Sequence, residues 1–172
     1  MVGGYGASLY NGRMRNIVRL TLLGPLLLGL PLAAAAADLR PKRPPENPAK
    51  ITLNVAPRAV HPGGRAEVTL TLAPIDGIKI ARYPQIKLEV PAQAGLVDQA
   101  KIALGSSTPP PLDELETNYW KQVDPLVLTL EVDEGASRGS HEVDAKLTYF
   151  FCVSGDYCAP ARVPLKIPLN VE

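Results

Sequence analysis

The chain has 172 residues, with 18 basic side chains, 17 acidic side chains, two histidines and two cysteines. All 17 acidic residues but only 15 of the 18 basic residues follow residue 37, so this part has a formal net charge of 15 − 17 = −2. That balance excludes the basic face of a nucleic-acid-binding protein, and about 135 residues suffice for one domain with a hydrophobic core.

The first 37 residues have the pattern of a secretory signal peptide. They contain no acidic residue, and three arginines precede an apolar run over residues 20–32. The alanines at residues 33–37 provide the small residues that precede a cleavage site. The run is too short to span a membrane, which takes about 20 apolar residues. We expect cleavage before Asp38, export to the periplasm or the medium, and no stable membrane span in the mature protein. Met14 is an alternative start that leaves this expectation unchanged.

The rest of the chain has the pattern of an all-β domain. Residues 38–50 contain four prolines without hydrophobic periodicity, which predicts an extended linker before a single domain over residues 51–172. Within that domain, apolar and polar residues alternate in short segments, as in half-buried antiparallel strands. Glycines and prolines between the segments favour a β-sandwich or barrel. The predicted strands cover residues 51–55, 68–72, 86–90, 127–132, 141–152 and 162–171.

Two features of the predicted strands and loops are unusual. Pro164 and Pro168 lie in the last strand, and because proline has no N–H for a sheet, that strand is expected at an edge or irregular.

Residues 105–124 form a long loop with three consecutive prolines, an acidic patch and the aromatic pair Tyr119 and Trp120. Such loops in small domains are often functional. The alternative is a simple crossover whose aromatic residues cap the core.

The two cysteines, Cys152 and Cys158, are the candidate site of chemistry. They flank five residues with turn-formers at the centre, a loop that allows the sulfurs to meet, and export to an oxidising compartment favours a disulfide. An inert structural disulfide and a redox-active pair both fit this spacing. A zinc site would need His61 or His141 as well, and this ligand set is incomplete, so we expect no metal ion and no cofactor.

Residues 119–171 resemble the N-terminal periplasmic domain of the thiol:disulfide interchange protein DsbD family. The matching elements are Leu147-Thr148-Tyr149, the C-x5-C pair, Pro160, Val163-Pro164-Leu165 and the apolar strand at residues 125–130. The resemblance implies an immunoglobulin-like antiparallel β-sandwich and thiol–disulfide exchange through Cys152 and Cys158. It also implies that Cys158 forms the mixed disulfide and that Cys152 resolves it. The implied partners are thioredoxin-like periplasmic proteins or a membrane electron-transfer protein.

The chain departs from the family where the family carries a loop with a shielding aromatic residue. The equivalent region, residues 111–120, is acidic but contains no aromatic residue before Tyr119 and Trp120. We therefore take Tyr119, Trp120, Glu116 and Tyr157 as the candidates for covering the disulfide. The alternative function is a non-catalytic immunoglobulin-like module, binding or structural, with an inert disulfide.

Overall fold

A computed structural model describes residues 45–153 and 157–172. The predicted signal peptide over residues 1–37, the linker up to residue 44, and the turn at residues 154–156 lie outside the described residues. The described part contains no helix that is long and apolar enough to cross a membrane.

The described chain folds into strands and a single short 3₁₀ helix, η1, which interrupts the long loop. The elements are β1 (Ala49–Ala56), β2 (Arg65–Pro74), β3 (Ile78–Ile80), β4 (Ile86–Val90), β5 (Ala100–Leu104), η1 (Leu112–Thr117), β6 (Leu126–Glu131), β7 (Gly139–Val153) and β8 (Tyr157–Val171).

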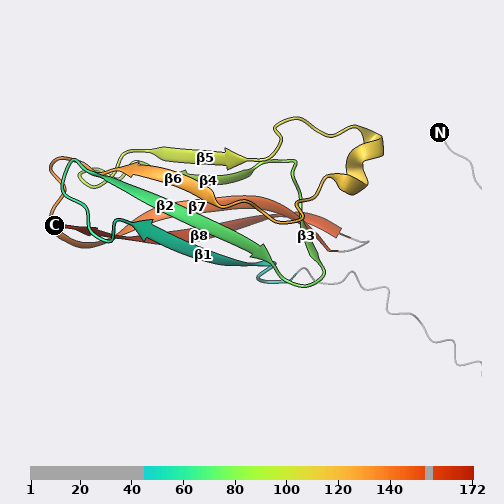
Figure 1. Ribbon diagram of the computed structural model, residues 1–172, viewed down its shortest axis with the longest axis horizontal. Coiled ribbons are helices and arrows are strands. Elements are labelled where there is room, and N and C mark those ends of the chain that lie inside the picture. The colour runs from blue at the N-terminus through green and yellow to red at the C-terminus, as the bar shows by residue number, and fades with distance from the viewer. Residues whose placement is uncertain (1–44, 154–156) are drawn as a thin grey trace, which may run out of the picture. The chain divides into compact units, whose positions relative to one another are not determined.

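The strands form two antiparallel sheets that pack face to face. One sheet has the order β1-β2-β6. In the other, β7 pairs along one edge with β3 and β4, β4 pairs with β5, and β8 pairs with the opposite edge of β7. Figure 1 shows the two layers, with η1 at the end of the domain where β7 ends and β8 begins. The predicted all-β, immunoglobulin-like antiparallel sandwich is confirmed.

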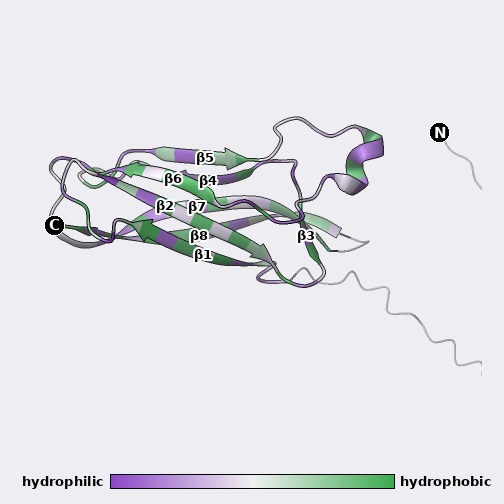
Figure 2. Cartoon of the chain, viewed as in Figure 1, coloured by the Kyte–Doolittle hydropathy of each residue, from purple (hydrophilic) through white to green (hydrophobic). Residues whose placement is uncertain are grey.

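The core lies between the sheets because the strands alternate in hydropathy. Alternate side chains of a strand point to opposite faces, so each strand contributes every second residue to the core. Figure 2 shows this alternation along β1 and β2. Among the completely buried side chains are Leu70 of β2, Leu88 of β4, Leu130 of β6 and Leu147 of β7.

All six predicted strands are present, but their bounds and number need correction. β1 begins at Ala49, inside the predicted linker, because Ala49 and Lys50 already pair with β2. β8 begins at Tyr157 because its pairing with β7 continues to the turn, past the stretch that alternates in sequence. Two further strands were not predicted: β3, which has three residues, and β5, whose alternation rests partly on alanines.

The prolines of β8 show that this strand is built as an edge. The carbonyl oxygen of Asn170 accepts a hydrogen bond from the Val60 amide at 2.9 Å, so even-numbered residues of β8 direct their backbone groups away from β7. Pro160, Pro164 and Pro168 share this parity. Their missing N–H groups therefore cost the β7–β8 ladder no hydrogen bond, and they deny donors to any strand that approaches from outside.

We expect the β7 core position to carry much of the stability. Leu147→Ala removes a completely buried side chain and should lower the free energy of unfolding by about 2–5 kcal/mol. Val127→Ala, at a side chain of β6 that is 43% exposed, should cost about 0.5 kcal/mol or less. Urea unfolding of the two disulfide-intact variants measures both values, and equal losses would contradict the assigned core.

Candidate redox site at the β7–β8 hairpin

The two cysteines form a disulfide across the β7–β8 hairpin, as the sequence predicted. The S–S distance is 2.01 Å, and Cys152 and Cys158 are direct partners in the strand register with Cα atoms 4.0 Å apart. Cys158 has the same parity as Asn170, so the two cysteines occupy a pair without backbone hydrogen bonds between them. Opposed residues come closest at such pairs, which is why the register itself brings the sulfurs together.

The disulfide lies on the outer face of the five-stranded sheet, and its two ends differ in exposure. Odd-numbered residues of β7 such as Tyr149 and Phe151 are buried in the core, so the even-numbered cysteines point outward. Cys158 is exposed, whereas Cys152 is only 7% exposed. An approaching thiol therefore meets Cys158 as the more accessible of the two residues.

Tyr119 covers Cys152 from a distant part of the chain. Its hydroxyl group donates a hydrogen bond to the Cys152 Sγ atom, with an O–S distance of 3.4 Å. Residues 118–120 are held in place by two backbone hydrogen bonds of 2.9 Å to residues 80–82, which extend β3. Since β3 is paired with the end of β7, this arrangement brings the tyrosine over the outer face of the hairpin.

Lys79 adds a positive charge beside the covered cysteine. It is the register partner of Cys152 on β3, so both side chains leave the same face of the sheet. Its ammonium nitrogen lies 5.2 Å from the centroid of the Tyr119 ring, within the range of a cation–π contact. Lys79 was not among the predicted site residues because β3 was not predicted, although Ile78-Lys79-Ile80 carries the alternation of a strand.

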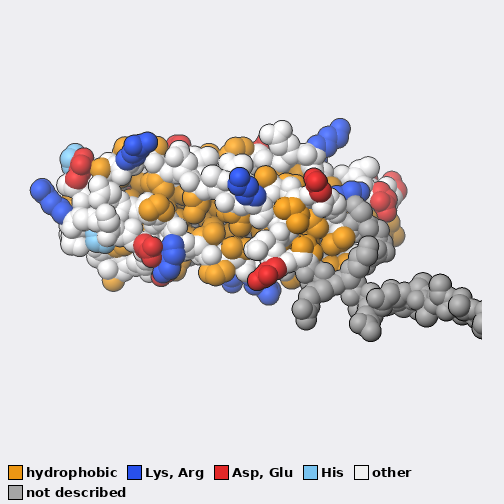
Figure 3. Space-filling view, turned by 90° about the horizontal axis from the view of Figure 1, so that it is seen from below, with side chains coloured by type: hydrophobic (Ala, Val, Ile, Leu, Met, Phe, Trp, Pro, Cys, Tyr) orange, Lys and Arg blue, Asp and Glu red, His pale blue; other side chains and the backbone are white. Residues whose placement is uncertain are grey.

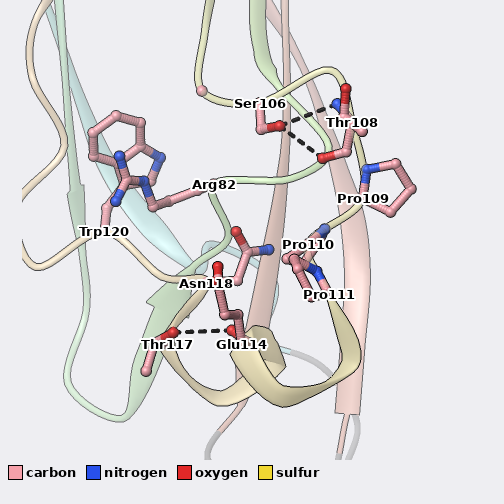
Figure 4. A pocket seen from close by; sticks show the side chains of 11 residues that line it. Arg82, Ser106, Thr108, Pro109, Pro110, Pro111, Glu114, Thr117, Asn118 and Trp120 are labelled. Carbon is pink, nitrogen blue, oxygen red and sulfur yellow. Dashed lines mark hydrogen bonds between the residues drawn. The ribbon is translucent and has the colours of Figure 1, made fainter.

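Trp120 belongs to a different cluster from its neighbour Tyr119. The guanidinium carbon of Arg82 lies 4.8 Å from the centroid of the Trp120 ring. Both residues line a cavity of about 600 Å³ that is bounded on its other side by residues 108–111 and η1. Figure 4 shows Arg82 stacked against Trp120, with the prolines across the cavity. The structure therefore places Trp120 in the wall of this cavity.

Glu116 and Tyr157 also lie apart from the sulfurs. Glu116 is exposed in η1, and its side chain makes no hydrogen bond or ion pair with the described residues. Tyr157 is 42% exposed and lines a cavity on the opposite face of the hairpin together with Tyr149 and Ala159. Of the four shielding candidates, Tyr119 is thus the residue that the structure brings into hydrogen-bonding contact with a cysteine.

The second cavity lies along the open side of the sandwich. It measures about 240 Å³ and separates residues 45–51 from β8. Figure 3 shows a band of hydrophobic side chains along this face of the domain. The hydroxyl of Tyr149 is buried at this wall and has no hydrogen-bond partner among the described residues. Burial raises the pKa of Tyr149 above its ordinary value.

The histidines lie far from the cysteines. His61 Nδ1 is 3.1 Å from the carbonyl oxygen of Glu172, and His141 Nε2 is 2.7 Å from that of Ser137. His141 and Cys152 are separated by about 36 Å along β7, at about 3.3 Å per residue. Over residues 45–153 and 157–172, no three His, Cys, Asp or Glu residues form a group that could hold a metal ion.

Comparison with known proteins leaves the family open. No family model and no curated protein matches the sequence. The structure is similar to that of murine CRIg, with a TM-score of 0.34 and 12% sequence identity, over 72% of this chain and 98% of that chain. A similarity at this level adds nothing to the description of the site. The chain is an immunoglobulin-like domain with one disulfide among its described residues.

Tyr149→Phe tests the unpartnered hydroxyl group. Removing it should leave the free energy of unfolding unchanged or raise it by up to about 1 kcal/mol at pH 7, because no hydrogen bond is lost. Unfolded tyrosine ionises near pH 10, whereas buried Tyr149 keeps its proton. Titration of this group therefore leaves the free energy of unfolding unchanged below about pH 10. The free energy of unfolding then falls as the pH rises from there through the folded-state pKa.

In Tyr149→Phe this part of the alkaline loss should be absent, so the variant should exceed the wild type increasingly above about pH 10. Urea unfolding at pH 7 and over an alkaline series measures both effects. A clear loss of stability at pH 7 would mean that the hydroxyl has a partner and would contradict this description.

Proposed function

We propose that this protein is an exported thiol–disulfide exchange domain that relays reducing equivalents through Cys152 and Cys158 to partner proteins in the periplasm. One observation carries the proposal. The disulfide lies on the outer face of a sheet, with Cys158 exposed and Cys152 buried and in contact with Tyr119. A disulfide that is buried in a core offers no such access, whereas exchange requires one sulfur that a thiolate can approach.

The difference in exposure supports a separate role for each cysteine. In the reduced protein, the Cys158 thiolate attacks a partner's disulfide, forms a mixed disulfide and releases one partner sulfur as a thiolate. The Cys152 thiolate then attacks the Cys158 sulfur, so that the intramolecular disulfide forms and the partner leaves fully reduced. Two electrons pass from the cysteine pair to the partner. The exposed and covered positions fit the order that the family resemblance implies.

The resemblance to the DsbD N-terminal domain supports the same function and its partners. Those partners are thioredoxin-like periplasmic proteins, or a membrane electron-transfer protein that supplies the electrons. The shielding aromatic residue, which the family carries in a loop, is provided here by Tyr119 at the end of the equivalent segment. The expected export rests on the leader pattern of residues 1–37.

The alternative is a non-catalytic immunoglobulin-like domain in which the disulfide is a structural crosslink. Closing so small a ring contributes about 2–2.5 kcal/mol in the chain-entropy description. The complete pairing of β7 with β8 up to Val153 and Tyr157 is compatible with this function as well. The redox potential separates the two functions.

An exchange domain should have a labile disulfide. We expect a midpoint potential at or above about −230 mV in titrations against glutathione or dithiothreitol buffers, followed by thiol alkylation and mass analysis. A potential far below about −300 mV is typical of structural disulfides and would assign this protein to the non-catalytic alternative.

Single-cysteine variants test the relay in the cell. Cys152→Ser should accumulate mixed disulfides with periplasmic proteins, because Cys158 is exposed and its resolving partner is missing. Cys158→Ser should accumulate few, since Tyr119 covers the remaining thiol. The double variant is the control for non-specific capture. If Cys152→Ser traps no more protein than the double variant, the proposed relay is wrong.

A further inference from the structure

We propose that Tyr119 is a catalytic residue of this exchange and that Lys79 positions it. The Tyr119 ring shields Cys152 from an attacking thiolate. The Tyr119 hydroxyl group stabilises the Cys152 sulfur when that sulfur leaves as a thiolate. This inference rests on the proposed function, because it explains how the same disulfide would react. Its chemical part concerns the isolated protein and can be tested without any physiological partner.

The hydroxyl group is aimed at the sulfur on which negative charge develops. When an incoming thiolate attacks, its sulfur forms a bond to the Cys158 Sγ atom and the bond between Cys158 and Cys152 breaks. The electron pair of the broken bond remains on the Cys152 Sγ atom, which lies 3.4 Å from the Tyr119 hydroxyl oxygen. Hydrogen bonds to charged acceptors are about twice as strong as those to neutral ones. The contact is therefore stronger in the transition state than in the resting disulfide.

The groups around Cys152 favour a thiolate at this position. Lys79 faces it from β3, Tyr119 faces it from residues 118–120, and Cys158 faces it from β8. Arg162 of β8 lies on the same face but four register pairs away, about 13 Å along the strand. No carboxylate occupies these positions among the described residues. A cation and a hydrogen-bond donor beside a sulfur both lower the cost of its ionisation.

Besides placing a positive charge beside Cys152, Lys79 acts through the tyrosine. Its ammonium nitrogen is 5.2 Å from the centroid of the Tyr119 ring, and the contact holds the ring on the outer face of the hairpin. The backbone on both sides is fixed independently by the hydrogen bonds between residues 118–120 and residues 80–82. Tyr119 is thus held from β3 and from its own segment before any partner arrives, which preorganises the donor.

Two variants at Tyr119 separate the hydroxyl group from the ring. In Tyr119→Phe the ring still covers Cys152, so glutathione should still attack Cys158, but about three- to tenfold more slowly because the hydrogen bond is missing. In Tyr119→Ala the cover is also lost, and glutathione should be found on both cysteines. The oxidised protein is mixed with glutathione, quenched in acid and mapped by peptide mass spectrometry.

Tyr157→Phe is the matched control, since it removes a tyrosine hydroxyl one residue from Cys158 on the opposite face of the hairpin. It should react at the wild-type rate and at the same sulfur. Circular dichroism and urea unfolding establish that each variant is folded. If Tyr119→Phe reacts as fast as the wild type, the hydroxyl group has no catalytic role. If Tyr119→Ala is still attacked at Cys158 alone, the ring is not the shield.

A pH profile tests the same contacts without any disulfide. In the Cys158→Ser background, thiolate absorbance at 240 nm reports the ionisation of Cys152. Adding Tyr119→Phe should raise the pKa of Cys152, and adding Lys79→Met should raise it as well, because each removes a group that favours the thiolate. Lys79→Arg keeps the positive charge, so it should leave the pKa of Cys152 close to its value with lysine. If the pKa of Cys152 is the same in all these variants, the proposal is wrong.

These outcomes separate the inference from the proposed function. A potential far below −300 mV would refute the relay, yet the Cys158→Ser profile would still show whether Tyr119 and Lys79 stabilise a Cys152 thiolate. Conversely, a high potential and trapped partners with an unmoved profile would support the relay and refute this role of Tyr119.

Discussion

The register between β7 and β8 is the constraint on which the site depends. It places Cys158, Pro160, Pro164 and Pro168 at positions of one parity, where the backbone groups of β8 point away from β7. The same parity sends both cysteines to the outer face and Tyr149 to the core. If β8 slipped by one residue, its prolines would stand where β7 requires N–H donors, and its core side chains would point to solvent. The buried alternation of β7 and the prolines of β8 therefore specify one register, and that register forms the disulfide.

The asymmetry of the disulfide comes from outside the hairpin. By themselves, β7 and β8 would present two similar sulfurs on an outer face. The difference arises because β3 pairs with the last residues of β7 and residues 118–120 pair in turn with the chain beyond β3. Tyr119 then covers Cys152 and leaves Cys158 exposed. A strand of only three residues thus decides which cysteine is open to attack.

The sequence predicted what depends on local pattern and missed what depends on distant pairing. Alternation identified the longer strands, and the cysteine spacing indicated a hairpin that could close a disulfide. It could not choose between Tyr119 and Trp120, which are adjacent in the chain. Once residues 118–120 pair with residues 80–82, neighbouring side chains point to opposite faces, so Tyr119 reaches Cys152 while Trp120 packs against the core. Lys79 was missed for a related reason, because three residues are too few for a periodic signal.

The position of the disulfide bears on the choice between crosslink and exchange. A crosslink stabilises mainly by restricting the unfolded chain, and this effect grows with the length of the loop that it closes. Cys152 and Cys158 lie six positions apart at the end of a hairpin whose strands already pair over their whole length. A crosslink between residues further apart in the chain would raise the free energy of unfolding more. At this end of the domain β3 and Tyr119 lie beside Cys152 while Cys158 is exposed, and a partner must dock at this exposed cysteine for exchange. The placement is therefore poor for a crosslink and well suited to thiol–disulfide exchange.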